Sequence, residues 1–259
     1  MKYKTKVLVN RFVETLSGWP GVECVSLNEA AFPDTLDAYF ALILDVFYSG
    51  EIPGPEERCG LYGDDAVVFE SANQGSKDRF LVGDIPVRIE YKSTAKIDEL
   101  VDIADSKRDQ LWLIKDSGTY GYYRLNHGEV LFARTDWIGK IRERLLNLDL
   151  AFWQAMRDAN QSKMEHYLSD LGAALIQEDN FHYLISSAGF IKSACLTLFC
   201  INRRFEPSHR AYDRQVHSLG VLPESFLAQF ETFLNGETDL AMERKYSLAQ
   251  LMARGIIAL

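Results

Sequence analysis

The chain has 259 residues, of which 47% are hydrophobic, 25% charged and 12% aromatic, and this balance excludes an intrinsically disordered protein. The 28 Lys and Arg against 37 Asp and Glu leave a formal net charge of -9, which argues against nucleic acid as the main partner. Asp45 and Lys192 interrupt the two most apolar stretches, so we expect no membrane span. The N-terminus develops no signal-peptide core and the four cysteines lack metal-site spacing, which predicts a cytoplasmic protein.

The first half of the sequence is predicted to combine strands with a few helices. Apolar residues over 5–19 recur on one helical face and indicate an opening helix. Five short apolar runs are typical of β-strands and lie at residues 22–26, 40–48, 66–69, 79–82 and 85–92. Ser93 or Thr94 is expected to cap a second helix, and residues 120–132 are predicted to form a hairpin that turns at Asn126-His127-Gly128.

The second half is helical in period from Asp136 onward. The predicted helices lie at residues 138–145, 152–176, 181–202, 212–219, 226–234 and 240–257. We therefore predict an α+β fold in which a mixed β-sheet domain is followed by an all-α helical bundle. The predicted boundaries are 1–135 for the sheet domain and 136–259 for the bundle.

Asp45 most needs an explanation, because it interrupts an apolar run that is suited to a buried strand. A buried carboxylate without a partner costs several kcal/mol, so we expect Asp45 to meet a cation, a metal ion or backbone donors. Residues 21–70 around it contain eleven acids and one base. This bias indicates either a solvated acidic surface or a carboxylate cluster that binds a hard cation such as Mg²⁺.

Glu90 is the natural neighbour of Asp45, since it lies on the charged face of a later predicted strand. If the two strands are close in one sheet, Asp45 and Glu90 can hold one Mg²⁺ between them, and Asp37 would complete the ligand set. The alternative is a structural salt bridge from either acid to Arg88 or Lys92.

Three segments together resemble a known family. Residues 36–48 look like the strand that carries the family's acidic pair, residues 85–92 look like the strand that carries its third acid, and residues 198–207 are similar to a segment of its helical half. The family is the polymerase beta-like nucleotidyltransferases, in particular the small bacterial group similar to the aminoglycoside nucleotidyltransferases. The resemblance implies Mg²⁺-dependent transfer of a nucleoside monophosphate from an NTP to a hydroxyl of a small molecule or protein.

The resemblance also implies roles for individual residues. Asp37, Asp45 and Glu90 would be both the catalytic residues and the Mg²⁺ ligands. The residues expected to hold the nucleotide phosphates are Ser26, Asn28, Arg88 and Lys92. The sequence departs from the family in lacking the Gly-Ser pair after the first strand, and Ile43 stands where the first acid of Asp-x-Asp is expected. A catalytically inactive relative that binds a nucleotide or a partner is therefore the alternative.

A less favoured alternative lies in the helical half. Arg204 and His209 have an Arg-x4-His spacing that resembles the motif of small helical-bundle ribonucleases. Basic residues at the end of an apolar helix also complement its dipole, which is the structural interpretation. The partners expected for the chain are an NTP, in the first place ATP, and an unknown acceptor, with neither a membrane nor nucleic acid among them. The sequence leaves a homodimer open.

Overall fold

The computed structural model describes residues 3–28, 42–235 and 241–259, and it divides the chain into two compact units. Unit 1 comprises Met1–Lys107 and Gly121–Asn147, and unit 2 comprises Arg108–Tyr120 and Leu148–Leu259. The chain therefore enters the second unit once before it completes the first. A single boundary between residues 135 and 136 would assign the segments 108–120 and 136–147 to the opposite units.

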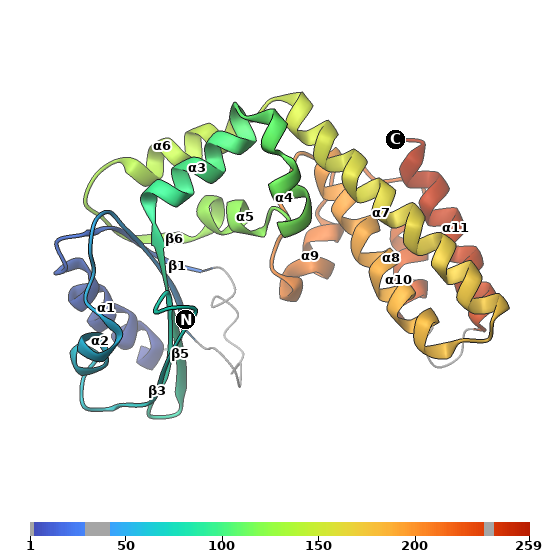
Figure 1. The fold of residues 1–259 in the computed structure, drawn as a ribbon. Helices are drawn as coiled ribbons and strands as arrows, with labels where there is room; N and C mark the ends of the chain where they lie inside the picture. The colour runs from blue at the N-terminus through green and yellow to red at the C-terminus, as the bar shows by residue number, and fades with distance from the viewer. Residues whose placement is uncertain (1–2, 29–41, 236–240) are drawn as a thin grey trace. The chain divides into compact units, whose positions relative to one another are not determined.

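Unit 1 is built on one six-stranded sheet (Figure 1). Its strands are β1 (Val22–Leu27), β2 (Leu42–Tyr48), β3 (Ala66–Ala72), β4 (Lys77–Val82), β5 (Ile85–Ser93) and β6 (Glu129–Ala133). The strand order is β3-β4-β5-β2-β1-β6. Only the β2 and β5 pair is parallel among these strands, so the sheet is mixed. Together with the helical second unit, the sheet confirms the predicted α+β fold.

One face of the sheet is covered by α1 (Tyr3–Ser17) and α2 (Pro55–Leu61). Phe12 and Leu16 lie one turn apart on α1 and are fully buried against strand residues such as Leu44 and Ile89. This apolar face explains why the helical period of the N-terminal segment correctly predicts α1.

The opposite face is approached by α3 (Thr94–Asp105), α5 (Tyr120–His127) and α6 (Trp137–Leu146). The ring of Trp137 on α6 lies 5.4 Å from the ring of Phe47 on β2. On α5, the hydroxyl of Tyr122 donates to the carbonyl of Leu100 on α3 at 2.7 Å. This face is therefore covered by helices that follow β5 in the chain.

The predicted hairpin over residues 120–132 is wrong. Tyr120–His127 forms the helix α5, and only Glu129–Ala133 forms a strand, which pairs with β1 rather than with its neighbour in sequence. The Gly128 N–H donates to the Arg124 carbonyl at 2.9 Å, so the predicted turn residues instead end a helix. Which strand β6 pairs with depends on contacts that are distant in the sequence, and local turn residues do not determine it.

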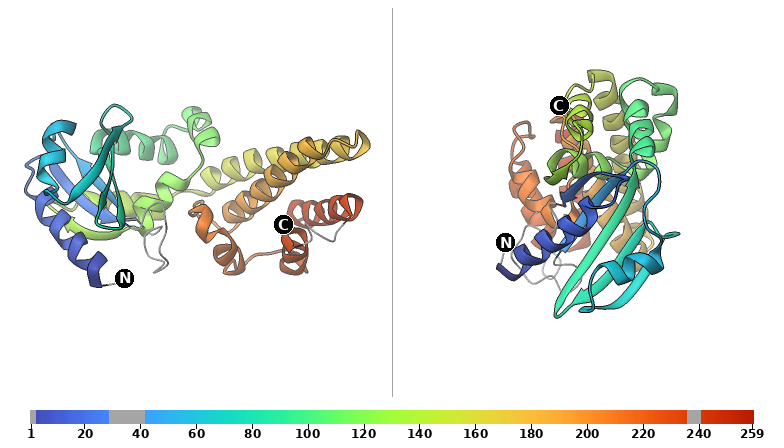
Figure 2. Two further views of the ribbon diagram at one scale, coloured as in Figure 1. Left: turned by 90° about the horizontal axis from the view of Figure 1, so that it is seen from below. Right: turned by 90° about the vertical axis from the view of Figure 1, so that its left-hand side faces the viewer.

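Unit 2 is all helical among its described residues. Its α-helices are α4 (Trp112–Ser117), α7 (Leu150–Ile176), α8 (Asn180–Ile201), α9 (Tyr212–His217), α10 (Phe226–Asn235) and α11 (Met242–Ile257). Helices α7 and α8 lie side by side, with α11 packed along them (Figure 2). Asp149 and Asp179 cap the starts of α7 and α8 by accepting hydrogen bonds from backbone N–H groups at 2.9 Å.

Helix α8 is the one described helix that is long and apolar enough to cross a membrane. Of its most apolar window, 56% is buried in the structure. Phe190 and Leu198, for example, are fully buried in the core of unit 2. This burial is compatible with a core helix of a soluble protein.

Candidate functional site: a carboxylate pair held by basic side chains

The register of the sheet brings the two predicted acids together. Ser26 on β1 lies opposite Asp45 on β2, Asp45 lies opposite Glu90 on β5, and Glu90 lies opposite Lys77 on β4. Residues opposite one another on neighbouring strands share a face of the sheet. Asp45 and Glu90 are therefore adjacent on the face that α5 approaches.

The other predicted site residues lie close to this row. Arg88 and Lys92 are two positions before and after Glu90 on β5, so they share its face. Asn28 follows β1, where it is buried and its N–H donates to the Ile43 carbonyl at 2.9 Å. Asp37 lies outside the described residues.

A residue that the sequence analysis did not select, Arg124 on α5, connects the two acids. Its Nε donates to Oδ2 of Asp45 at 3.0 Å, and its Nη2 makes a second, closer contact with Oδ1. Its Nη1 lies 2.7 Å from Oε2 of Glu90. One guanidinium group, itself buried, thus binds both carboxylates at once, which is the planar geometry that arginine offers and lysine does not.

Three further cations surround the pair. Lys92 Nζ lies 2.9 Å from Oδ1 of Asp45 and 3.5 Å from Oε2 of Glu90. Arg88 Nη2 and Lys77 Nζ lie 2.5 Å and 3.6 Å from Oε1 of Glu90. The side chains of Lys77, Arg88 and Lys92 are 20–23% exposed, whereas that of Asp45 is 1% exposed. Two carboxylates against four cations leave this group with a net charge of +2.

The surrounding positive charges shift the pKa of Glu90. Burial by itself raises the pKa of this carboxyl, because it disfavours the charged form. Arg124, Lys92, Arg88 and Lys77 outweigh burial and lower the pKa of Glu90 to about 2. The carboxylate is therefore held in its charged form by the cations around it.

The described residues do not fit a magnesium ion at this pair. Mg²⁺ prefers oxygen ligands in octahedral geometry, and the oxygens of Asp45 and Glu90 already face nitrogen cations. A divalent ion would add two positive charges to a group that already carries +2. Over residues 3–28, 42–235 and 241–259, three or more His, Cys, Asp or Glu side chains gather nowhere in a metal-binding arrangement.

Arg204 and His209, the residues of the ribonuclease alternative, have different partners in unit 2. Arg204 is exposed, and its Nη1 donates to the Ser218 hydroxyl at 2.8 Å. His209 Nε2 lies 3.7 Å from Oε1 of Glu206, and the His209 ring packs edge-on against Tyr212. These contacts support the structural interpretation of the segment over a shared catalytic site.

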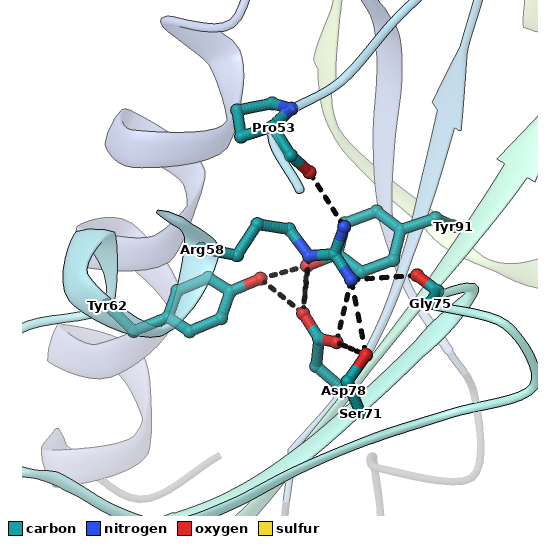
Figure 3. Close-up of polar contacts among 7 residues, drawn as sticks. All are labelled: Pro53, Arg58, Tyr62, Ser71, Gly75, Asp78 and Tyr91. Carbon is teal, nitrogen blue, oxygen red and sulfur yellow. Dashed lines mark hydrogen bonds and ion pairs between the residues drawn. The ribbon is translucent and has the colours of Figure 1, made fainter. Parts of the chain in front are cut away.

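A second ionic cluster lies on the opposite face of the sheet, and the charged side chains at its centre are buried (Figure 3). Arg58 on α2 donates to both oxygens of Asp78 on β4, at 2.7 and 2.9 Å. The carbonyls of Pro53 and Gly75 each accept from the same guanidinium at 2.7 Å. Arg58 thereby joins α2 to the β3–β4 hairpin.

Tyrosine and serine hydroxyls complete this cluster. Tyr62 and Tyr91 each donate to Oδ2 of Asp78, at 3.0 and 2.9 Å, and Ser71 donates to Oδ1 at 2.8 Å. Burial, followed by nearby negative charge, raises the pKa of Tyr62 well above its ordinary value. With its polar groups hydrogen-bonded and Arg58, Asp78, Tyr62 and Tyr91 buried, the cluster has the features of a structural network.

Sequence reasoning missed Arg124 and the Arg58 and Asp78 cluster for different reasons. Arg124 and His127 before Gly128 are typical of a helix C-terminus, and this signal could have revealed α5. Arg58 and Asp78 offered no local signal, because each lies in a polar stretch of the sequence and is buried only by the tertiary fold.

Comparison with known proteins identifies a fold. No protein-family description and no curated protein matches the chain. Among solved structures, the chain is similar to a nucleotidyltransferase-like protein from Exiguobacterium sibiricum, with 10% sequence identity and a TM-score of 0.50. The match covers 98% of this chain and 74% of that one. The chain thus has a nucleotidyltransferase-like fold, with a sheet domain and a helical unit.

Proposed function

We propose that this protein is a catalytically inactive nucleotidyltransferase-like protein that binds the phosphates of a nucleotide without Mg²⁺. The observation that carries the proposal is the position of Arg124, whose guanidinium group bridges Asp45 and Glu90. A group transfer that relies on metal ions needs carboxylates that are free to hold them. Arg124 instead supplies a fixed positive charge between the two acids.

The surplus of positive charge supports the binding of an anion. After Asp45 and Glu90 are neutralised, a charge of +2 remains among Arg124, Lys92, Arg88 and Lys77. Lysine and arginine side chains form strong charge-assisted hydrogen bonds with phosphate oxygens. In this proposal Arg88 and Lys92, which are partly exposed, hold the phosphate chain, and the carboxylates hold the cations in place.

Mg²⁺-dependent transfer of a nucleoside monophosphate to an unknown hydroxyl acceptor is the second candidate function. The pairing of Asp45 with Glu90 in the register of β2 and β5 favours it, since two adjacent carboxylates are a minimal metal-binding arrangement. This function requires Arg124 and Lys92 to leave the carboxylates when metal and nucleotide bind.

Calorimetric titration with ATP, once in EDTA and once with excess Mg²⁺, distinguishes the two functions. For the inactive protein we expect ATP to bind in EDTA, and Lys92→Gln to weaken binding about tenfold, because it removes a charge-assisted hydrogen bond. Asp45→Asn and Glu90→Gln should preserve or tighten binding, since each removes a negative charge near the phosphates while its amide oxygen can still accept hydrogen bonds from the cations. Lys96→Gln, at an exposed lysine of α3, is the matched control and should leave binding unchanged.

If the protein is a transferase, the Asp45→Asn and Glu90→Gln variants should instead bind ATP more weakly. Binding that requires Mg²⁺ and disappears in Asp45→Asn and Glu90→Gln would overturn the proposal, as would Mg²⁺-dependent release of pyrophosphate from ATP. Absence of ATP binding in both buffers would overturn nucleotide binding and leave the group as a structural network.

A further inference from the structure

Helix α8 carries apolar side chains on its outer surface in a regular pattern. Phe181, Leu184 and Ile185 are 75%, 57% and 52% exposed, and Ala188 is exposed one turn further on. Positions i, i+3, i+4 and i+7 lie on one face of a helix, so these four residues form a continuous stripe, which we call the α8 stripe. Single exposed apolar residues are ordinary on protein surfaces, whereas a contiguous set indicates an interaction site.

The buried face of the same helix makes the stripe more unusual. Ser186, Ser187 and Ser193 are at most 5% exposed, although they are polar. Leu184 and Ile185 are thus exposed next to the buried Ser186 and Ser187, although the same helix also buries large apolar side chains such as Phe190. Ile176, at the end of α7, adds a further side chain that is 85% exposed close to the start of α8.

Charges at the two ends of the stripe indicate what covers it. Lys192 follows Ala188 by one turn on the same face; its side chain is 50% exposed, and its Nζ lies 3.9 Å from Oε1 of Glu206 in the same chain. Glu178 is exposed just before the helix begins. If two copies of α8 pair in antiparallel fashion about a two-fold axis between Leu184 and Ile185, Lys192 of each copy comes beside Glu178 of the other. A parallel pairing would place Lys192 against itself, which is repulsive.

A membrane surface fits the same stripe poorly. Interfacial helices commonly carry Lys and Arg beside their apolar face, which attract anionic lipids. The α8 stripe is instead preceded by Glu178 and Asp179, which anionic lipid headgroups repel. Charge complementarity therefore favours a second copy of this chain over lipid.

We propose that the α8 stripe is a homodimer interface, in which two copies of α8 pack in antiparallel fashion and Lys192 of each faces Glu178 of the other. A standard stable interface buries about 1,600 Å² in total, and the four residues of the stripe span only two helical turns, so this interface is smaller than that. The dimer is therefore weak and reversible, and it depends on protein concentration.

Sedimentation velocity of the full chain from about 5 to 500 µM tests the proposal. For the wild type we expect monomer and dimer to exchange with each other. For Leu184→Glu we expect a dissociation constant of the dimer that is at least tenfold higher, because the two introduced charges face each other across the axis. Leu146→Glu is the matched control, since Leu146 is an apolar side chain 71% exposed on α6 of unit 1. Both substitutions replace exposed side chains, and circular dichroism verifies that both variants fold.

Two further variants test the orientation. Lys192→Gln and Glu178→Gln should each weaken the dimer about threefold, and the double variant should weaken it no more than either single one, because the two residues share one interaction. In a Cys59→Ser background, Ile185→Cys should form a disulfide-linked dimer on oxidation, since position 185 lies next to the proposed axis.

The outcomes that overturn the proposal are distinct from those for nucleotide binding. A wild type that stays monomeric throughout, or a dimer that Leu184→Glu does not affect, would overturn it. If the wild type sediments with phosphatidylserine vesicles and Leu184→Glu abolishes this co-sedimentation, the stripe would be assigned to a lipid surface instead. ATP titration of Leu184→Glu reports separately on the carboxylate pair in unit 1, so the two proposals can fail independently.

Discussion

Two arginine and aspartate pairs in unit 1 have the same chemistry but different burial. The side chains of Arg58 and Asp78 are 3% and 0% exposed, whereas those of Arg11 and Asp65 are 37% and 53% exposed. We expect Arg58→Met to lower the free energy of unfolding by about 3–5 kcal/mol, because it leaves the Asp78 charge buried without its cation. Arg11→Met should lower it by less than about 1 kcal/mol, since water screens the exposed pair.

Urea unfolding followed by circular dichroism measures both changes. The double variant Arg58→Met with Asp78→Leu should recover most of the loss, because it removes both buried charges together. Equal losses for Arg58→Met and Arg11→Met would contradict the importance of burial in this comparison.

Glu90 predicts a pH dependence of stability. Its pKa of about 2 in the folded protein lies below the ordinary value of 4.5, so the unfolded chain binds the proton more readily between these two values. The stability that Glu90 contributes, on the order of 3 kcal/mol, is fully present above pH 4.5 and is lost as the pH falls toward 2. Glu90→Gln should therefore be less stable than the wild type at pH 7, and the difference should shrink on acidification.

The measurement is urea unfolding at a series of pH values from 7 to about 3. Glu56→Gln is the control, because Glu56 is exposed on α2. A difference between Glu90→Gln and the wild type that stays constant over the whole range would show that the cations do not hold the Glu90 carboxylate as described.

Helix α5 is positioned by the close approach of its C-terminal end to β1. A methyl group added at Gly128 would lie 2.9 Å from the Arg124 carbonyl oxygen and 3.2 Å from the Ser26 hydroxyl. Gly128→Ala should therefore displace the turn that carries Arg124 and cost about 1–3 kcal/mol of stability. Gly121→Ala in the same helix meets nothing within 4 Å and should be neutral or stabilising by up to about 1 kcal/mol.

Thermal unfolding compares the two alanine variants, and ATP titration of both connects the element to the site. We expect only Gly128→Ala to weaken ATP binding, since only this variant disturbs Arg124. An equal effect of Gly121→Ala would mean that α5 responds to helix propensity and not to its contact with β1.

At the scale of the whole molecule, each unit has its own hydrophobic core. Phe12 belongs to the core between α1 and the sheet, and Phe190 belongs to the core of the helical unit. Phe190→Ala should lower the free energy of unfolding of unit 2 by about 3–5 kcal/mol. It should raise the rate of hydrogen exchange in α7, α8 and α11, with little change in the strands of unit 1. Phe12→Ala should do the reverse.

Hydrogen exchange measured by mass spectrometry detects this difference. Loss of protection in both units with either variant would show that the two cores unfold as one cooperative unit. The predicted independence follows from the separate burial of the two cores.

The sequence by itself determined the elements that have a clear local period. The apolar stripe of α1, the alternation along β5 and the long helices α7 and α8 were all predicted, because side chains that face a core repeat every 3.6 or 2 residues. The anomaly of Asp45 within an apolar strand was also visible, as was Glu90 on a charged face.

Only the tertiary structure decided which residues meet. The parallel pairing of β2 with β5 and the arrival of Arg124, 79 residues after Asp45, are long-range contacts that leave no periodic trace in the sequence. The segment 120–132 was predicted as a hairpin for the same reason, since its strand pairs with β1 far earlier in the chain. Local patterns report on burial, whereas the choice of partner depends on the free energy of the whole fold.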